Sequence, residues 1–213
     1  MKLQITHLLV VFFLSLPLFS QEEDRYNKFS AEAGIGVHVP LAPNDFISRS
    51  NYVSLGHTEI GLRYMFNQKL GLKLAYANNR FRDQDNSDLG INYNRIGIEG
   101  HYNLGRLLLP YYIYNKVAFF GHAGVSYARA SPVKESFSEQ TGTLSIGFKP
   151  QVKITDRISV FADGSYHFNF KQHYSYSGQL LSPGFEEEMG SFTTLSFGVI
   201  FNLGNKKHHA DWY

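Results

Sequence analysis

Residues Thr193–Leu203 read TTLSFGVIFNL, and the alternation in this stretch decides the fold. Counted from Thr193, every second residue is mostly apolar, with Phe197 and Phe201 among three aliphatic side chains and no charge. The positions between them are polar or small, apart from Ile200. Successive side chains of a β-strand point to opposite faces, so the pattern predicts a strand with one apolar face. Eleven residues also suffice for a tilted strand that crosses a bilayer.

The same stretch carries a second pattern, because Ser196, Gly198, Phe201 and Leu203 follow the spacing S-x-G-x-x-F-x-L. This spacing resembles the C-terminal strand signal of bacterial outer-membrane β-barrels, with Leu203 where an aromatic residue is usual. The resemblance implies recognition by the barrel assembly machinery during biogenesis. A half-buried strand of a soluble sandwich is the alternative that one strand leaves open.

The beginning of the chain has the layout of a secretory signal peptide over residues 1–20. Lys2 is its only formal charge, Leu8–Phe19 is an apolar run, and Ser20 is a small residue suited to cleavage. About 12 apolar residues are too few for a spanning helix. The mature chain is therefore expected to start near Gln21.

Composition narrows the class of protein. The chain has no Cys, which excludes a disulfide and a lipoprotein signal. It is rich in Tyr, Phe and Gly, and its net charge of +2 argues against nucleic acid as a partner. Secretion, aromatic residues and two-residue alternation together favour a β-barrel in the outer membrane of a Gram-negative bacterium.

Eight segments share the alternation, and a helical period fits none of them as well. Together they predict an all-β, eight-stranded, antiparallel up-and-down transmembrane barrel at 21–204. A short polar periplasmic tail is expected at 205–213. The predicted strands are Phe29–Val39, ended by Pro40, then His57–Phe66, Leu70–Ala77, Arg95–Tyr102, Val117–Tyr127, Leu144–Lys153, Ile158–Phe170 and Thr193–Leu203.

The connections alternate between long and short, as they do in outer-membrane barrels. The segment 103–115 departs from this pattern, because it is longer than a turn and rich in Leu and Tyr. It is interpreted as lying at the inner membrane–water interface. Long polar loops are expected at 41–51, 78–90, 129–142 and 171–190, and tight turns at 67–69 and 155–157.

Charged residues occupy the polar face of the segments. The interior of an eight-stranded barrel is only wide enough for side chains, so opposite charges there are expected to pair. The hypothesis is a lumen plugged by ion pairs instead of an open pore, and the alternative is a solvated sheet face. The inward charges are Glu32, Glu59, Arg63, Lys73, Arg95, Glu99, Lys149, Lys153 and Asp163.

Residues Phe29–Leu203 resemble the transmembrane domain of the OmpA family and related small, porin-like barrels. The resemblance rests on the alternation, the signal peptide and the end strand. It implies a structural or surface-interaction role in the cell envelope, contact with outer-membrane lipids and lipopolysaccharide, and an unknown extracellular ligand for the loops. OmpA proteins usually continue into a peptidoglycan-binding domain, which is not expected here because the chain ends at Tyr213.

One loop carries residues with catalytic potential. His173 and Ser175, followed by Glu187, are similar to the His, Ser and Glu of outer-membrane lipid A deacylases, with Tyr176 where that family has Asn. The implied chemistry has Ser175 as nucleophile, His173 as base and the Glu as orienting group. Loop residues in solvent are the preferred interpretation, so no enzyme, cofactor or metal is expected.

The histidines on strands lack short metal-ligand spacing and are interpreted as hydrogen-bonding lumen residues. In the tail, His208 and His209 could bind a metal, but an exposed polar terminus is preferred. A third hypothesis for function is an accessory barrel of a secretion apparatus. The strand histidines are His38, His57, His101, His122 and His167.

Overall fold

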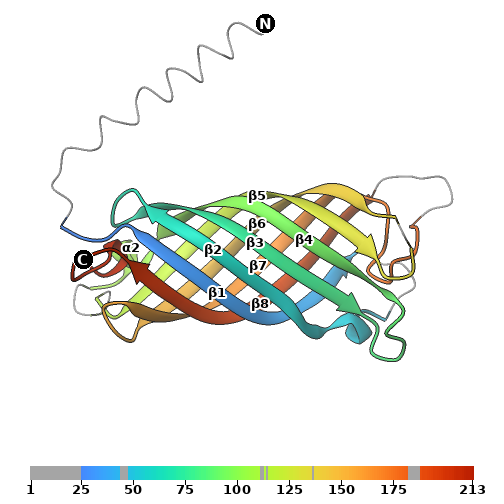
Figure 1. Cartoon of the computed structure of the whole chain (residues 1–213), viewed down its shortest axis with the longest axis horizontal. Helices are drawn as coiled ribbons and strands as arrows, with labels where there is room; N and C mark the ends of the chain where they lie inside the picture. Colours follow the sequence, from blue (N-terminus) through green and yellow to red (C-terminus); the bar gives the residue numbers. More distant parts are fainter. Residues whose placement is uncertain (1–24, 44–47, 111–112, 114, 136, 182–187) are drawn as a thin grey trace, which may run out of the picture.

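The computed structural model describes residues 25–43, 48–110, 113, 115–135, 137–181 and 188–213. The predicted signal peptide lies outside these ranges. The described chain forms one closed barrel in which each strand pairs with its neighbours in sequence and β8 closes against β1. The predicted eight-stranded antiparallel barrel is therefore confirmed (Figure 1).

The strands are as long as the predicted segments or longer, so the barrel extends beyond the thickness that about 9–11 tilted residues would cross. Short helical turns lie at both ends of the barrel: η2 (Arg49–Tyr52), α2 (Gly105–Leu108) and η3 (Ala210–Trp212). The strands are β1 (Phe29–Ala42), β2 (Ser54–Met65), β3 (Leu70–Arg82), β4 (Gly90–Asn103), β5 (Val117–Pro132), β6 (Glu139–Lys153), β7 (Ile158–Gln172) and β8 (Glu188–Leu203).

Alternate residues of each strand point outward and inward, as the sequence predicts. On β8, Phe197 is 60% exposed and Phe201 49%, whereas Ser196 and Asn202 on the opposite face are 5% and 4% exposed. Outward apolar side chains recur on every strand, and no charged side chain separates Leu70, Leu72 and Leu74 on the outer face of β3. Such an uncovered apolar surface is stable against lipid acyl chains but not against water.

Most strands extend farther at the outer end of the barrel than predicted. Pro40 does not end β1, which continues to Ala42. Beyond His38, β1 pairs only with β8, and proline is tolerated on a segment with one partner. The connection between β3 and β4 is also shorter than the predicted 78–90, because β3 continues to Arg82 and β4 begins at Gly90.

The tight turns are built as the sequence suggests. Asn67 accepts hydrogen bonds on Oδ1 from the N–H groups of Lys69 and Leu70. Thr155 does the same through Oγ1 for Arg157 and Ile158. Side-chain oxygens that bond the backbone two and three residues on stabilise such turns. Both turns lie at the end of the barrel where the C-terminus lies, which we take as the periplasmic end (Figure 1).

The tail differs from the exposed terminus predicted above. His209, Asp211 and Trp212 are each at most 5% exposed, because the tail folds back onto the inner end of the barrel. The N–H of Asn27 bonds the carbonyl of His208, and the carbonyl of Asn27 accepts from Ala210. Among the described residues, no helix is long and apolar enough to cross a membrane.

Candidate functional site in the barrel lumen

A connected group of ion pairs crosses the middle of the lumen, the interior of the barrel. Lys73 on β3 lies at its centre, with its Nζ 2.5 Å from Glu59 Oε1, 3.4 Å from Glu99 Oε2 and 3.6 Å from Glu32 Oε2. The Lys73 side chain is 1% exposed. An ammonium so deeply buried is stable only with carboxylates around it, so this side chain on β3 links its own strand to β1, β2 and β4.

Glu32 on β1 extends the group across the barrel. Its carboxylate lies 3.1 Å from Arg63 Nε and 2.8 Å from Lys149 Nζ, and Lys149 lies 3.4 Å from Asp163. Arg63 also pairs with Asp211 of the tail at 2.6 Å. The side chains of Glu32, Arg63, Lys149 and Asp211 are all at most 1% exposed. Residues far apart in sequence therefore meet in one continuous charged layer.

The structure brings seven of the nine predicted lumen charges together in this layer. Lys153 is elsewhere, because it pairs with Asp156 at 2.6 Å beside the inner turn and is partly exposed. Arg95 lies in the lumen, but among the described residues it bonds His167 Nδ1 at 2.8 Å and Asn79 Oδ1 at 3.2 Å and no carboxylate. The seven residues in the layer are Glu32, Glu59, Arg63, Lys73, Glu99, Lys149 and Asp163.

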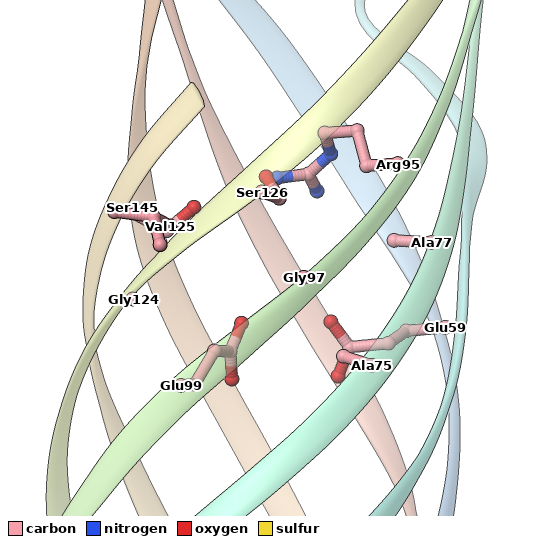
Figure 2. Close-up of a pocket in the computed structure, with 10 residues that line it drawn as sticks. All are labelled: Glu59, Ala75, Ala77, Arg95, Gly97, Glu99, Gly124, Val125, Ser126 and Ser145. Atoms are coloured by element: carbon pink, nitrogen blue, oxygen red, sulfur yellow. The ribbon is translucent and has the colours of Figure 1, made fainter. Parts of the chain in front are cut away.

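A small cavity separates Arg95 from the charged layer (Figure 2). The Arg95 guanidinium reaches toward Ser126 on one side, and Glu59 and Glu99 point into the same space from the other. The cavity volume is about 10 Å³, which is close to the space that one water molecule needs. The lumen at this level is filled by side chains, as expected for eight strands.

The outer end of the lumen is closed by an apolar cluster, here called the outer closure. Phe81 lies at its centre, with ring centroids 4.5 Å from Tyr176, 5.4 Å from Phe192 and 5.8 Å from Tyr93. The prediction of a polar inner face missed this cluster, although Phe81 is an even number of residues from Lys73 on β3 and so lies on the same inner face. The outer closure consists of Tyr52, Phe81, Ile91, Tyr93, Ala128, Ala130, Tyr174, Tyr176 and Phe192.

The inner end is closed by the tail, and this contact is called the inner closure. Trp212 packs with Met65, Ala118 and Phe120 of two strands, β2 and β5. Asp211 accepts from Gln151 Nε2 at 2.9 Å in addition to its pair with Arg63. Burial alone would raise the pKa of Asp211, but the Arg63 guanidinium beside it dominates and holds that pKa below its ordinary value.

The predicted deacylase residues do not form a hydrogen-bonded pair. His173 Nδ1 lies 3.0 Å from Glu139 Oε2 on β6, and the same oxygen accepts from the His173 N–H. Ser175 is 1% exposed, and its Oγ lies 2.5 Å from Ser177 Oγ. Glu187 lies outside the described residues. Among those that are described, His173 is therefore oriented by Glu139, and Ser175 lacks a neighbouring base.

The structure joins three residues that sequence spacing did not connect. Glu99 and His101 are two apart on β4, and His122 lies directly opposite His101 on β5. One ligand atom from each lies within 4.8 Å of the other two. Part of this group could have been found from the sequence, because Glu99 and His101 are two residues apart and lie on the same face of one strand. The pairing of β4 with β5 then places His122 beside them.

The residues of the predicted assembly signal lie on both faces of β8. Phe201 and Leu203 point outward, and Ser196 points into the lumen. Leu203 is paired with Phe29 at the seam where β8 meets β1. The end strand is thus the element that closes the barrel.

Comparison with known proteins gives likeness in structure alone. No protein-family model and no curated protein matches the sequence. Neisserial surface protein A is similar with a TM-score of 0.55 and 15% identity, over 82% of this chain and 97% of that one. A major outer membrane protein from Thermus thermophilus is similar with a TM-score of 0.51 and 13% identity, over 83% of this chain and 99% of that one.

At these identities the likeness establishes the fold, which is that of small eight-stranded outer-membrane barrels. The localisation follows from the fold together with the molecule's own surface. Exposed aliphatic and aromatic side chains cover the outer faces of the strands, and the charges are inside. This arrangement is stable in a bilayer and opposite to that of a water-soluble sandwich, so the chain is an outer-membrane β-barrel.

Proposed function

We propose that this barrel has a structural or surface-interaction role, with a lumen closed to solutes and with no enzymatic activity. The observation that carries the proposal is the continuous filling of the lumen by the outer closure, the charged layer and the inner closure. A hydrated solute would have to displace buried ion pairs, each of which is costly to separate. Interaction with other molecules then falls to the outer loops, which a rigid barrel presents.

A liposome-swelling assay tests the closed lumen. Vesicles that contain the mature chain are expected to show no faster swelling in an arabinose gradient than empty vesicles. A porin in matched vesicles serves as the positive control. Rapid sugar flux through the unaltered barrel would contradict the proposal.

The outer loops offer a recess that supports the surface-interaction part of the proposal. It has a volume of about 410 Å³ and lies between three connections, with Leu89, Lys134 and Leu180 among its lining residues. Crosslinking on intact cells followed by pull-down is expected to capture an extracellular ligand. Repeated capture of secretion components instead would favour the accessory-barrel hypothesis.

The two interactions proposed for the barrel wall are with lipid and with the assembly machinery. The outward aliphatic side chains suit acyl tails, and lipopolysaccharide is the partner proposed for the outer leaflet. Ser196, Gly198, Phe201 and Leu203 are proposed as the assembly signal. Phe201→Ala is expected to lower the amount of folded barrel in the outer membrane, whereas Phe137→Ala in an outer loop is expected to leave it unchanged.

Lipid A modification is the enzymatic alternative, and one variant distinguishes it. Ser175→Ala is expected to leave the acylation pattern of lipid A unchanged in mass spectra of whole-cell extracts. The reason is the contact geometry, because Ser175 bonds Ser177 and His173 bonds Glu139. A missing acyl chain that reappears in the variant would replace the non-enzymatic proposal.

A further inference from the structure

One group of side chains in the lumen is arranged like the ligands of a metal ion. Glu99, His101 and His122 all point inward from neighbouring strands. His101 Nε2 lies 3.3 Å from Glu99 Oε2, and His122 Nδ1 lies 3.7 Å from the same oxygen. Ligands of a tetrahedral zinc ion are roughly 3.4 Å apart when metal–ligand bonds are about 2.1 Å. Both distances to the Glu99 oxygen are therefore close to the spacing of zinc ligands, and all three ligand atoms lie within 4.8 Å of one another.

The histidines in this group are buried and have ring nitrogens without well-aligned hydrogen bonds. His122 is 6% exposed, and neither of its ring nitrogens forms a hydrogen bond of good geometry with the described residues. His101 is fully buried, and its Nδ1 is likewise without one. Buried polar atoms in native proteins are nearly always satisfied, so His122 Nδ1, which faces Glu99, indicates a missing partner at this site. The two rings stack at 5.0 Å with an interplanar angle of 10°.

Asp163 supplies the outer contact that metal-bound histidines usually have. Its Oδ2 lies 3.2 Å from His122 Nε2, whereas Glu99 is nearest to the other ring nitrogen, Nδ1. A carboxylate that accepts the remaining N–H of an imidazole fixes the tautomer and orients the other nitrogen toward the metal. Asp163 is itself held by Lys149 at 3.4 Å and by Ser165 at 2.5 Å.

The charge balance of the layer also favours an added cation. When Asp211 of the tail and Arg95 are counted with the layer and the histidines are neutral, carboxylates outnumber cations by five to four. Lys73 also lies 3.4 Å from Glu99 Oε2, but its closest partner is Glu59, 2.5 Å away, and it leaves the surplus of one carboxylate. The carboxylates are Glu32, Glu59, Glu99, Asp163 and Asp211, and the cations are Arg63, Lys73, Arg95 and Lys149.

We propose that Glu99, His101 and His122 bind one divalent transition metal ion of the zinc class. Imidazole and carboxylate ligands suit zinc, and a three-residue set leaves the fourth position for water. The bound ion joins β4 to β5 inside the lumen and offsets the surplus negative charge. Its role is structural, since the site lies between the two closures.

Metal analysis of the untagged mature chain tests the proposal. The chain is refolded in detergent with zinc sulfate, dialysed against metal-free buffer and measured by plasma mass spectrometry. About one equivalent of zinc is expected in the unaltered barrel. His101→Gln and His122→Gln are expected to retain less than about a tenth as much, and Asp163→Asn to bind zinc about 10–100-fold more weakly.

Two controls separate this site from other histidines. His38→Gln removes a buried lumen histidine that contacts Ser54. His208→Gln removes a partly exposed histidine of the tail. Both variants are expected to retain zinc. Retention by His122→Gln, or loss caused by either control, would overturn the proposal.

A second measurement covers the case in which a histidine variant does not fold. Cobalt added to the unaltered barrel is expected to give visible absorption bands of a four-coordinate site, and zinc is expected to abolish them. Folding of each variant is checked by its electrophoretic mobility without heating. A folded, unaltered barrel that binds neither metal would overturn the proposal.

Discussion

The outer and inner closures of the lumen are built from different parts of the chain and by different forces. The outer closure is an aromatic cluster centred on Phe81, and most of its residues belong to strands that the barrel already holds in place. The inner closure depends on residues after the last strand, and its main polar contact is the pair between Arg63 and Asp211. The first is an apolar core, and the second is a segment held by an ion pair, several hydrogen bonds and one indole ring.

This difference indicates which closure can be separated from the barrel. Removing a ring from the outer closure leaves a cavity within a packed cluster, and the surrounding strands cannot collapse to fill it. Removing the Asp211 carboxylate from the inner closure should allow the tail to leave the barrel as a unit. The loss of stability is then set by the Arg63 guanidinium, which stays buried without that partner. The following variants test that distinction.

The largest effect is expected from Phe81→Ala. The ring contacts Tyr176, Phe192 and Tyr93, so its loss should lower the free energy of unfolding by about 3–5 kcal/mol. Urea titration of the barrel in lipid vesicles measures the change. Phe137→Ala is the matched control, because that ring is 67% exposed in an outer loop and should change stability by less than about 0.5 kcal/mol. Equal effects in both variants would show that the outer closure is not a packed core.

The next effect is expected from Asp211→Ala. Arg63 keeps Glu32 but loses its shorter contact, so the cost should be near the lower end for a broken buried pair, about 3 kcal/mol. The chain has a single Trp, and Trp212 is 5% exposed, so its fluorescence reports on the inner closure alone. A red shift and faster iodide quenching are expected in the variant.

The exposed pair between Asp88 and Lys134 provides the control for that result. Its atoms are 3.9 Å apart and both side chains are more than half exposed, so Asp88→Ala should change stability by less than about 1 kcal/mol. The Trp212 spectrum should not change. A blue-shifted, protected Trp212 in Asp211→Ala would mean that apolar packing alone holds the tail.

The two closures also show how far the sequence predicts this fold. Alternation depends on neighbouring residues, so the eight strands and their inward charges could be predicted. Ion pairing depends on strand register as well, so alternation alone predicts Arg95 and Lys153 in a network that they do not join. Predicting the outer closure would have required longer strands, because Phe81 and Phe192 lie beyond the predicted ends of β3 and β8.

The inner closure and the histidine group were harder to predict, for a different physical reason. The tail sequence is mostly polar, and the burial of Asp211 depends on its contacts with Arg63 and Gln151, which are distant in sequence. Similarly, His122 meets His101 through the pairing of β4 with β5, which no local spacing reveals. Contacts between distant residues depend on the closed barrel and not on any single segment.

A smaller effect, on pH dependence, should distinguish the inner closure from the outer. The folded-state pKa of Asp211 is depressed, so its contribution to stability is present above the unfolded value of about 4 and is lost as pH falls toward the folded value. The stability difference between the unaltered chain and Asp211→Asn should therefore be constant above pH 5 and shrink below pH 4. The difference for Phe81→Ala should remain more nearly constant over the same range. Urea titrations at pH 3, 5 and 7 measure both differences. A stability difference for Asp211→Asn that grows at low pH would contradict a depressed pKa for Asp211 in the folded state.

The smallest effect is expected from Lys153→Met, outside both closures and outside the charged layer. Lys153 pairs with Asp156 at a partly exposed turn, where water screens the interaction, so the cost should be less than about 1 kcal/mol. Lys149→Met is the matched variant inside the layer, because the fully buried Lys149 ammonium forms ion pairs with both Glu32 and Asp163. Its loss should cost several times more, about 3 kcal/mol. Equal costs in urea titrations would mean that burial in the lumen does not set the energy of these pairs, and the distinction between a charged layer and an exposed turn would fail with it.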